Sequence, residues 1–261
     1  MYSIKNDIFK DNMEKYSDPL LYDIHHKNFM KDFPLILEYA KKQQGHIIEL
    51  ACGTGRLTIP LCETGYSITG VDINEGMLKR AKEKAKEKKL EISWLLQDCT
   101  KLSIEKLADF IFMTGNSFQH FLTNESQNQL LQSVYNHLQT NGIFIFDTRY
   151  PNLSELATID EYVETYTDSM SRMITEFSSD TYNPLTQILF CESKRETINE
   201  DGTKKQLGIE SISLRYVFPM EMERLLEHNG FTILEKYGSW EKEPLCDKHC
   251  QMIYVCQKTP K

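Results

Sequence analysis

The chain has 261 residues, 40% of them hydrophobic and 26% charged, so it can bury a full core as one domain with an elaboration. Its formal net charge of −8 at pH 7 argues against a broad surface for nucleic acid or anionic membranes. No apolar run reaches the roughly 18 residues of a membrane span, and residues 1–15 are too polar for a signal peptide. Seven scattered cysteines do not form a disulfide framework and suit a reducing compartment. We therefore expect a cytoplasmic protein.

Residues 1–44 have a mainly helical pattern. Tyr16-Ser17-Asp18-Pro19 predicts a turn that leads into a helix, because proline is favoured at the first helical positions. Apolar residues at helical spacing predict a second helix at about residues 32–42. Nothing in this segment completes a sheet, so we expect a helical cap that precedes the core.

Strand and helix patterns alternate from residue 45 to about residue 150, which is typical of a parallel α/β sheet. Polar, small or aromatic residues follow each predicted strand, at the edge where open α/β sheets bind ligands. The predicted strands are residues 46–51, 66–71, 92–96, 108–113 and 143–146. The predicted helices are residues 55–64, a helix opened by Asn74-Glu75-Gly76, and residues 125–138, which Asn141-Gly142 should end.

The periodicity changes after Pro151. Three strands are predicted, at residues 171–182, 186–198 and 204–217, with turns at Asn183-Pro184 and Asp201-Gly202. They predict a three-stranded antiparallel meander inserted into the α/β domain. A helix from Pro219 to Asn229-Gly230 and two last strands, at residues 231–237 and 251–257, complete the chain.

A glycine loop follows the first predicted strand. The apolar residues 47–50 lead into Cys52-Gly53-Thr54-Gly55, and a helical pattern begins soon afterwards. Glycines let the backbone approach a ligand closely, and the start of a helix offers free N–H groups to it. Asp72 closes the second predicted strand, near the offset of about 20 residues at which an acidic side chain suits a ribose diol. The arrangement predicts a nucleoside site, with a glycine turn that binds nothing as the alternative.

Two features argue against a dinucleotide in this site. Thr58 stands where the G-x-G-x-x-G fingerprint has its third small residue. Glu49 places a negative charge at the strand end, where it would oppose a pyrophosphate but favour a cationic nucleoside. S-adenosylmethionine is such a ligand, since it carries an ammonium and a sulfonium. The segment Glu49-x-Ala51-Cys52-Gly53-Thr54-Gly55, followed by Asp72, resembles the first motif of class I S-adenosylmethionine-dependent methyltransferases.

This resemblance implies a Rossmann-like α/β fold. We expect a seven-stranded, mostly parallel sheet with an antiparallel final strand and helices on both faces. The cofactor-binding core would comprise residues 45–150 and 217–261. Residues 1–44 would form the helical cap, and residues 151–216 would form the three-stranded antiparallel lid.

The resemblance also implies a set of residues that bind S-adenosylmethionine and its product S-adenosylhomocysteine. Asp72 would accept hydrogen bonds from the ribose, and Asp98 with Cys99 would bind the adenine. Asn116 would lie beneath the methionine moiety, and Tyr22 on the cap, together with Tyr16, could close over its carboxylate. The full predicted set is Tyr22, Glu49, Ala51, Gly53, Gly55, Asp72, Ile73, Met77, Asp98, Cys99 and Asn116. For Asp98, a helix N-cap or a turn is the alternative role.

Methyl transfer from a sulfonium needs little chemical help from the protein, because the donor is already activated. A base is needed only if the acceptor arrives protonated. His120 is the candidate base, since it follows the fourth strand, and a structural histidine is the alternative. Arg149 and Tyr150 could hold an acceptor, or could pack the sheet end against the lid. Cys246, His249 and Cys250 lack a second ligand pair spaced for zinc, so no metal is expected.

The predicted function is methyl transfer from S-adenosylmethionine to a nitrogen or oxygen of a small molecule. An antiparallel insert after the fifth strand resembles small-molecule methyltransferases, including amino-sugar and glycine N-methyltransferases. The alternatives are a catalytically silent S-adenosylmethionine-binding module, an RNA methyltransferase and an NAD(P)-dependent oxidoreductase. The sequence leaves open the acceptor, the methylated atom, the use of a base, and whether the protein is a monomer or a homodimer.

Overall fold

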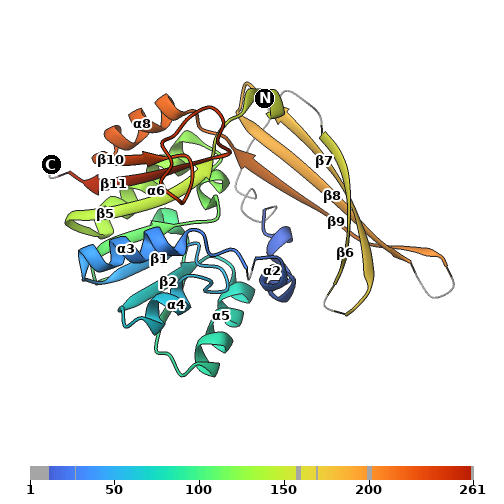
Figure 1. The fold of residues 1–261 in the computed structure, drawn as a ribbon, viewed down its shortest axis with the longest axis horizontal. Helices are drawn as coiled ribbons and strands as arrows, with labels where there is room; N and C mark the ends of the chain where they lie inside the picture. The colour runs from blue at the N-terminus through green and yellow to red at the C-terminus, as the bar shows by residue number, and fades with distance from the viewer. Residues whose placement is uncertain (1–11, 27, 157–159, 169, 199–201, 260–261) are drawn as a thin grey trace.

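The computed structural model describes residues 12–26, 28–156, 160–168, 170–198 and 202–259. The chain forms a seven-stranded sheet with helices on its faces, and a second, four-stranded sheet projects from it (Figure 1). None of the described helices is long and apolar enough to cross a membrane. Residues 1–11 of the expected cap and Asp201 of the second predicted turn lie outside the described residues.

The main sheet has the strand order β10-β11-β5-β4-β1-β2-β3. Strands β1 to β5 are parallel, and β11 is antiparallel to both of its neighbours, β5 and β10. This confirms the predicted seven-stranded sheet with an antiparallel last strand. Its strands are β1 (Ile47–Leu50), β2 (Ile68–Asp72), β3 (Ser93–Leu96), β4 (Ala108–Met113), β5 (Leu138–Arg149), β10 (Phe231–Tyr237) and β11 (Gln251–Lys258).

Strand β5 begins earlier than predicted. Helix α6 (Asn124–His137) ends at His137, and β5 starts at the next residue. The prediction that Asn141-Gly142 ends the helix was therefore wrong. These residues lie inside β5, where Asn141 has a φ of 64° and the pairing with β4 changes register. A left-handed residue suits this irregularity as well as it suits a helix end.

Helices cover both faces of the main sheet because its strands are apolar on both sides. Successive residues of β4 point to opposite faces, so Phe110 and Phe112 pack in one apolar cluster and Ile111 and Met113 in the other. The first cluster includes residues of α3 (Phe33–Gln43) and α4 (Thr58–Glu63), and the second includes residues of α6 and α8 (Pro219–His228). Helix α5 (Glu75–Glu87) contacts β2 and β3. The structure thus places α3, expected in the cap, against the sheet.

The second sheet contains four strands, not the predicted three. Strands β7 (Met173–Asn183), β8 (Ile188–Ile198) and β9 (Lys204–Arg215) match the expected meander, and β6 (Asp160–Thr167) pairs antiparallel with β7 along its whole length. The prediction missed β6 because acidic residues interrupt its apolar pattern. An edge strand tolerates such residues, since it has a neighbour on one side only.

The short elements within residues 12–26, which we continue to call the cap, lie between the two sheets (Figure 1). Helix α2 (Pro19–His26) begins at Pro19 as predicted, and Asp18 Oδ1 accepts hydrogen bonds from the backbone N–H groups of Leu20 and Leu21. The remaining short helices are η1 (Glu14–Tyr16), η2 (Cys99–Lys101), η3 (Ser117–His120) and α7 (Leu153–Leu156).

The indole of Trp94 packs over two glycines near the predicted nucleoside loop. A Cβ on Gly70 would lie 2.6 Å from the Trp94 ring and 3.0 Å from Cys52 Sγ. A Cβ on Gly55 would lie 2.8 Å from the same ring, and Gly55 also has a φ of +79°. Contacts this short require a shift of the indole, so β2, β3 and the loop depend on one another.

We therefore expect Gly70→Ala to lower the free energy of unfolding by about 1–3 kcal/mol, because it overpacks this site. The measurement is urea denaturation followed by circular dichroism. Gly208→Ala is the matched control, since Gly208 also lies in a strand but its Cβ would meet nothing within 4 Å. The double variant Gly70→Ala/Trp94→Leu should recover part of the loss. Equal costs for the two glycine substitutions would contradict this packing.

Candidate functional site

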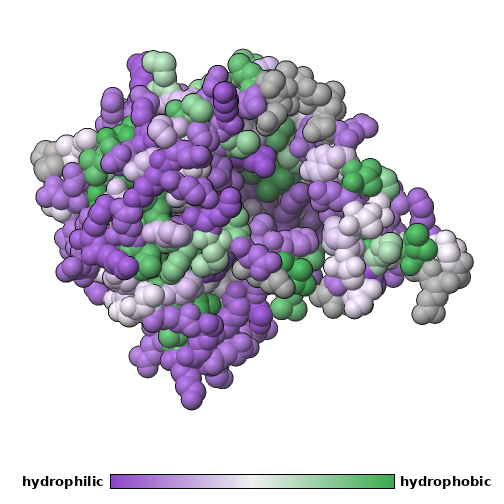
Figure 2. All heavy atoms as spheres, viewed as in Figure 1, coloured by the Kyte–Doolittle hydropathy of each residue, from purple (hydrophilic) through white to green (hydrophobic). Residues whose placement is uncertain are grey.

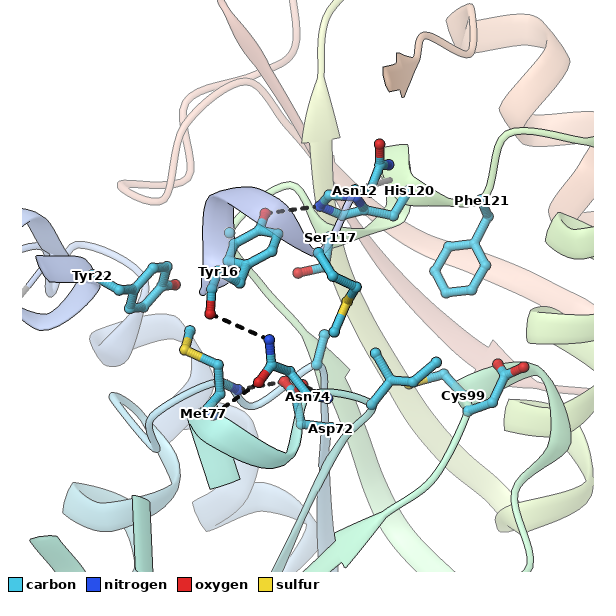
Figure 3. Close-up of a pocket in the computed structure, with 16 residues that line it drawn as sticks. Asn12, Tyr16, Tyr22, Asp72, Asn74, Met77, Cys99, Ser117, His120 and Phe121 are labelled. Carbon is cyan, nitrogen blue, oxygen red and sulfur yellow. Dashed lines mark hydrogen bonds between the residues drawn. The ribbon is translucent and has the colours of Figure 1, made fainter. Parts of the chain in front are cut away.

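The parallel strands of the main sheet end at a cavity that the cap covers (Figure 3). We call it the first cavity. Eight of the residues predicted to bind the cofactor line it: Tyr22, Ala51, Gly53, Asp72, Ile73, Met77, Asp98 and Cys99. Tyr16 and His120, which the sequence also offered for the site, line it as well. The remaining lining residues are Asn12, Met13, Asn74, Gly115, Ser117 and Phe121. The resemblance found the strand ends and two tyrosines of the cap, whereas Asn12 and Met13 become neighbours of the cavity only through folding.

Three residues with left-handed backbone conformations shape the loop after β1. Ala51, Gly53 and Gly55 have φ values of 51°, 54° and 79°. A Cβ on Gly53 would lie 3.5 Å from the methyl group of Met77, on the cavity side. Gly53 therefore keeps the cavity open, while Gly55, which packs under Trp94, does not line it.

Asp72 at the end of β2 holds this loop. Its Oδ2 accepts a hydrogen bond of 2.7 Å from the backbone N–H of Gly53, and its Oδ1 accepts one of 2.8 Å from that of Asn74. Burial raises the pKa of the Asp72 carboxyl, and the backbone hydrogen bonds act in the opposite direction. Each oxygen has two lone pairs, so the carboxylate can hold the loop and still accept hydrogen bonds from a diol.

Asp98 has the N-cap role that the sequence offered as the alternative for it. Its Oδ1 accepts hydrogen bonds of 2.8 Å from the backbone N–H and from the hydroxyl of Thr100, which makes it the N-cap of η2. It also lines the first cavity beside Cys99. Burial raises the pKa of the Cys99 thiol to about 12, so this side chain stays uncharged at neutral pH.

Glu49 lies beneath the loop and outside the first cavity. It is 3% exposed and lies on the side of β1 that faces α4, where Thr58 Oγ1 donates a hydrogen bond to it. Burial raises the pKa of Glu49 to about 8, so the carboxyl is largely protonated at neutral pH. Thr58, expected to mark an incomplete fingerprint, is thus the partner of Glu49. Together they support the loop from below.

A second cavity opens between the cap, the ends of β4 and β5, and the inner face of the four-stranded sheet. Figure 2 shows the recess between the main body and this sheet. Tyr16, Tyr22 and Gly115 line both cavities, so the two adjoin. Its other lining residues include Asn116 and Asp147 from the main sheet, His25 and His26 from α2, and Tyr166, Glu176, Arg195 and Glu210 from the second sheet.

Asn116, predicted beneath the methionine moiety, lines this second cavity rather than the first. It follows Gly115 in a tight turn, and both residues are left-handed, with φ values of 75° and 58°. Its backbone N–H donates a hydrogen bond of 2.9 Å to Asp147 Oδ1. The turn thus brings the end of β4 against the end of β5.

Asp147 was not among the predicted site residues. It is 1% exposed, and burial raises the pKa of its carboxyl to about 7. A signal was present in the sequence, since Asp147 follows the apolar run Phe144-Ile145-Phe146 at the carboxyl end of a central strand. A carboxylate at such a position is costly to bury and needs a reason to be there.

Arg56, the residue after the loop glycines, was also missed. Its guanidinium forms a two-pronged ion pair with Asp32 at 2.8 and 2.5 Å and donates to the carbonyl of Phe29 at 2.7 Å. Asp32 is fully buried at the start of α3. The pair joins the loop after β1 to the segment between α2 and α3.

Both ring nitrogens of His120 have partners in the first cavity (Figure 3). The Asn12 side chain pairs with the backbone of Ser213, so its amide nitrogen faces His120 Nδ1 at 3.1 Å. Nδ1 must then accept, and Nε2–H donates to the Tyr16 hydroxyl at 3.0 Å. Burial lowers the pKa of His120 to about 4. The neutral imidazole thus links the cap, β9 and the loop after β4.

The other two candidate catalytic residues line neither cavity. The Arg149 guanidinium donates to the Tyr216 hydroxyl at 3.5 Å, and Tyr150 packs against the apolar cluster below α6 and α8. Cys246 and His249 contact each other at 3.3 Å between Sγ and Nδ1.

A family model for a "Methyltransferase domain" matches residues 47–142. This segment runs from β1 into β5 and contains the loop, Asp72 and Asp98.

Curated relatives align with the same part of the chain. A glycine/sarcosine N-methyltransferase of Aphanothece halophytica is 31% identical over 105 residues, which are 40% of each protein. A malonyl-[acyl-carrier protein] O-methyltransferase of Priestia megaterium is 35% identical over 108 residues, 41% of this chain and 37% of the relative. The chain spans less than half of the length of these relatives, whose names differ in the atom that is methylated.

Solved structures share nearly the whole fold. A S-adenosylmethionine-dependent methyltransferase from Clostridium acetobutylicum ATCC 824 has a TM-score of 0.79 at 21% identity, covering 92% of this chain and 98% of its own. An amino pentose methyltransferase from Micromonospora echinaspora has a TM-score of 0.68 at 13% identity, covering 91% and 96%. Residues 47–142 thus match a methyltransferase domain, and nearly the whole chain shares the fold of solved S-adenosylmethionine-dependent methyltransferases.

Proposed function

We propose that this protein transfers a methyl group from S-adenosylmethionine, bound in the first cavity, to a nitrogen or oxygen of a small molecule in the second. The observation that carries the proposal is the contact between the two cavities at Tyr16, Tyr22 and Gly115. Transfer requires donor and acceptor to meet in line with water excluded, and two adjoining cavities under a common cap suit this requirement.

The first cavity has residues that suit each part of S-adenosylmethionine. Asp98 and Cys99 would hold the adenine, and Asp72 would accept from the ribose hydroxyls. Ala51 and Gly53 let the backbone approach the methionine moiety, and Tyr22 would cover it. The cofactor supplies a methyl group on a positively charged sulfur, which is already activated. The protein's own contribution is therefore to orient the two reactants and to exclude water.

The enclosure of the second cavity supports a small acceptor. The cap and the four-stranded sheet form its walls, and charged side chains line it. The name of the glycine/sarcosine N-methyltransferase supports a small molecule, whereas the O-methyltransferase is named for an acyl group on a carrier protein, so the relatives leave the methylated atom open. All seven cysteines are free, which supports the expected cytoplasmic location because thiols stay reduced there.

We assign His120 a positioning role. The imidazole cannot accept a proton unless it gives up its bond from Asn12, because its other nitrogen already donates to Tyr16. Its position between the cap and β9 suits a residue that keeps Tyr16 over the boundary of the cavities. A proton released by the acceptor would therefore be taken up by a group other than His120.

Asp72→Asn should weaken the binding of S-adenosylhomocysteine about 10- to 100-fold, the cost of one charge-assisted hydrogen bond. Isothermal titration calorimetry gives the affinities. Asp109→Asn is the matched control, since Asp109 also accepts a backbone N–H, from His46, but lines neither cavity. Tight binding by the Asp72 variant would contradict the assignment of the first cavity.

Turnover separates an enzyme from a silent binding module. We expect label from methyl-tritiated S-adenosylmethionine to appear in small molecules of a metabolite extract, and Asp72→Asn to reduce that transfer at least 10-fold at limiting cofactor. Fractions of small-molecule size are separated from RNA before counting. Label in RNA alone would favour the RNA methyltransferase alternative, and cofactor binding without transfer would favour the silent module.

The neutral state of His120 should make a destabilising contribution to the folded protein in acid. The unfolded chain takes up the proton near the ordinary histidine pKa of about 6.5, whereas the folded protein resists it down to about 4. The contribution of His120 to the free energy of unfolding therefore falls as the pH drops through this window, by about 1–2 kcal/mol between pH 7 and pH 5. Buried carboxyls with raised pKa values act in the opposite direction, so the comparison is between variants: urea denaturation should show that acidification from pH 7 to pH 5 is less destabilising, or more stabilising, for His120→Asn than for the wild type by this amount. His228→Asn, at an exposed residue of α8, should follow the wild type.

A further inference from the structure

We propose that the acceptor is a hydrophilic amine, and that Asp147 binds its nitrogen and takes up the proton released by methylation. This inference rests on the proposed function and specifies the acceptor of the same site. It starts from the position of Asp147 at the carboxyl end of β5, in the wall of the second cavity. Its neighbour Asn116 follows Gly115, where the two cavities meet.

No cation forms an ion pair with Asp147 among the described residues. The charge of the Arg56 guanidinium acts to lower the pKa of Asp147, but this group is paired with Asp32. The other guanidinium of the second cavity, that of Arg195, is paired with Glu210. Asp147 has one short hydrogen bond, from the backbone N–H of Asn116, and a long one of 3.5 Å from Gln251 Nε2. A buried carboxylate normally has a cation or several donors as partners. Asp147 therefore has few donors for a buried carboxyl in a cavity wall.

A second acceptor beside it also lacks a donor. In the described part of the chain, the buried Oδ1 of Asn116 has no hydrogen-bond partner. Buried polar atoms are nearly always paired, so an unpaired one in a cavity wall points to a ligand group. Two neighbouring acceptors suit an amine, which can donate two N–H bonds, better than a hydroxyl, which can donate one.

The opposite wall indicates that the rest of the acceptor is hydrophilic. Tyr166, Glu176, Arg195 and Glu210 lie on the face of the second sheet that lines the cavity. The Tyr166 hydroxyl donates to Glu176 at 3.0 Å, and Arg195 pairs with Glu210. A molecule with hydroxyl or other polar groups can exchange hydrogen bonds with this wall, whereas an apolar molecule would leave it unsolvated.

The reaction then balances within the site. The lone pair of the neutral amine attacks the methyl carbon as the carbon–sulfur bond breaks, and its electron pair stays on sulfur as a neutral thioether. The new N–C bond leaves a positive charge and an excess proton on nitrogen. The Asp147 carboxylate accepts that proton and later releases it to water. Burial raises the pKa of Asp147 to about 7, which makes it a stronger base than an ordinary aspartate.

Sinefungin tests the assignment, because this analogue of S-adenosylmethionine has a primary amine in place of the methylated sulfonium. We expect calorimetry to show that the wild type binds sinefungin at least 10-fold more tightly than S-adenosylhomocysteine. Asp147→Asn should reduce the sinefungin affinity about 10-fold and leave the S-adenosylhomocysteine affinity within twofold. Asp109→Asn should change neither.

The outcomes separate the two proposals. Wild-type protein that binds S-adenosylhomocysteine but prefers sinefungin by less than 10-fold would overturn the role of Asp147 and leave the proposed function standing. The same holds if Asp147→Asn weakens both ligands equally. Wild-type protein that binds neither ligand would overturn the proposed function itself. The wild-type comparison requires no variant, so it decides even if Asp147→Asn fails to fold.

Discussion

The site depends on one buried carboxylate that joins two strand ends. Asp72 accepts the backbone N–H of Gly53 from the loop after β1 and that of Asn74 from the start of α5. A parallel sheet leaves such groups unpaired at its carboxyl edge, and an acidic side chain of the neighbouring strand satisfies both at once. These two bonds help to hold the left-handed shape of the loop, and the Asp72 side chain also lines the first cavity.

Burial separates the acidic groups of the site into different roles. Glu49 lies under the loop with Thr58 as its partner, and its raised pKa makes it a hydrogen-bonding support rather than a charge. Asp72 is held as an acceptor by backbone donors. Asp147 has fewer donors and a pKa near neutrality, so it is suited to exchange a proton. The solvation of each carboxyl, more than its place in the sequence, decides what it can do.

The cap is fastened by polar contacts over long sequence distances. Asn12 pairs with the backbone of Ser213 and donates to His120, and the Tyr16 carbonyl accepts from Asn74 (Figure 3). These contacts tie the cap to the second sheet, to the loop after β4 and to α5. The cap that covers the first cavity is thus in contact with the second sheet, which forms a wall of the adjoining cavity.

The sequence by itself determined the main sheet, its antiparallel last strand and most of the first cavity. Period-2 and period-3.6 patterns reflect burial along each element, and the glycine loop with Asp72 is a local motif. Tertiary structure decided the rest. Acidic residues interrupt the apolar pattern of β6, which an edge strand tolerates because it has a neighbour on one side only. Glu49, predicted to bind the cofactor, accepts a hydrogen bond from Thr58 beneath the loop, because it lies on the side of β1 that faces α4. Asn12 and Arg56 join the site through contacts between segments distant in sequence, which no local pattern encodes. Asp147 follows an apolar strand, which is a local signal, but its contact with Asn116 is decided by the fold.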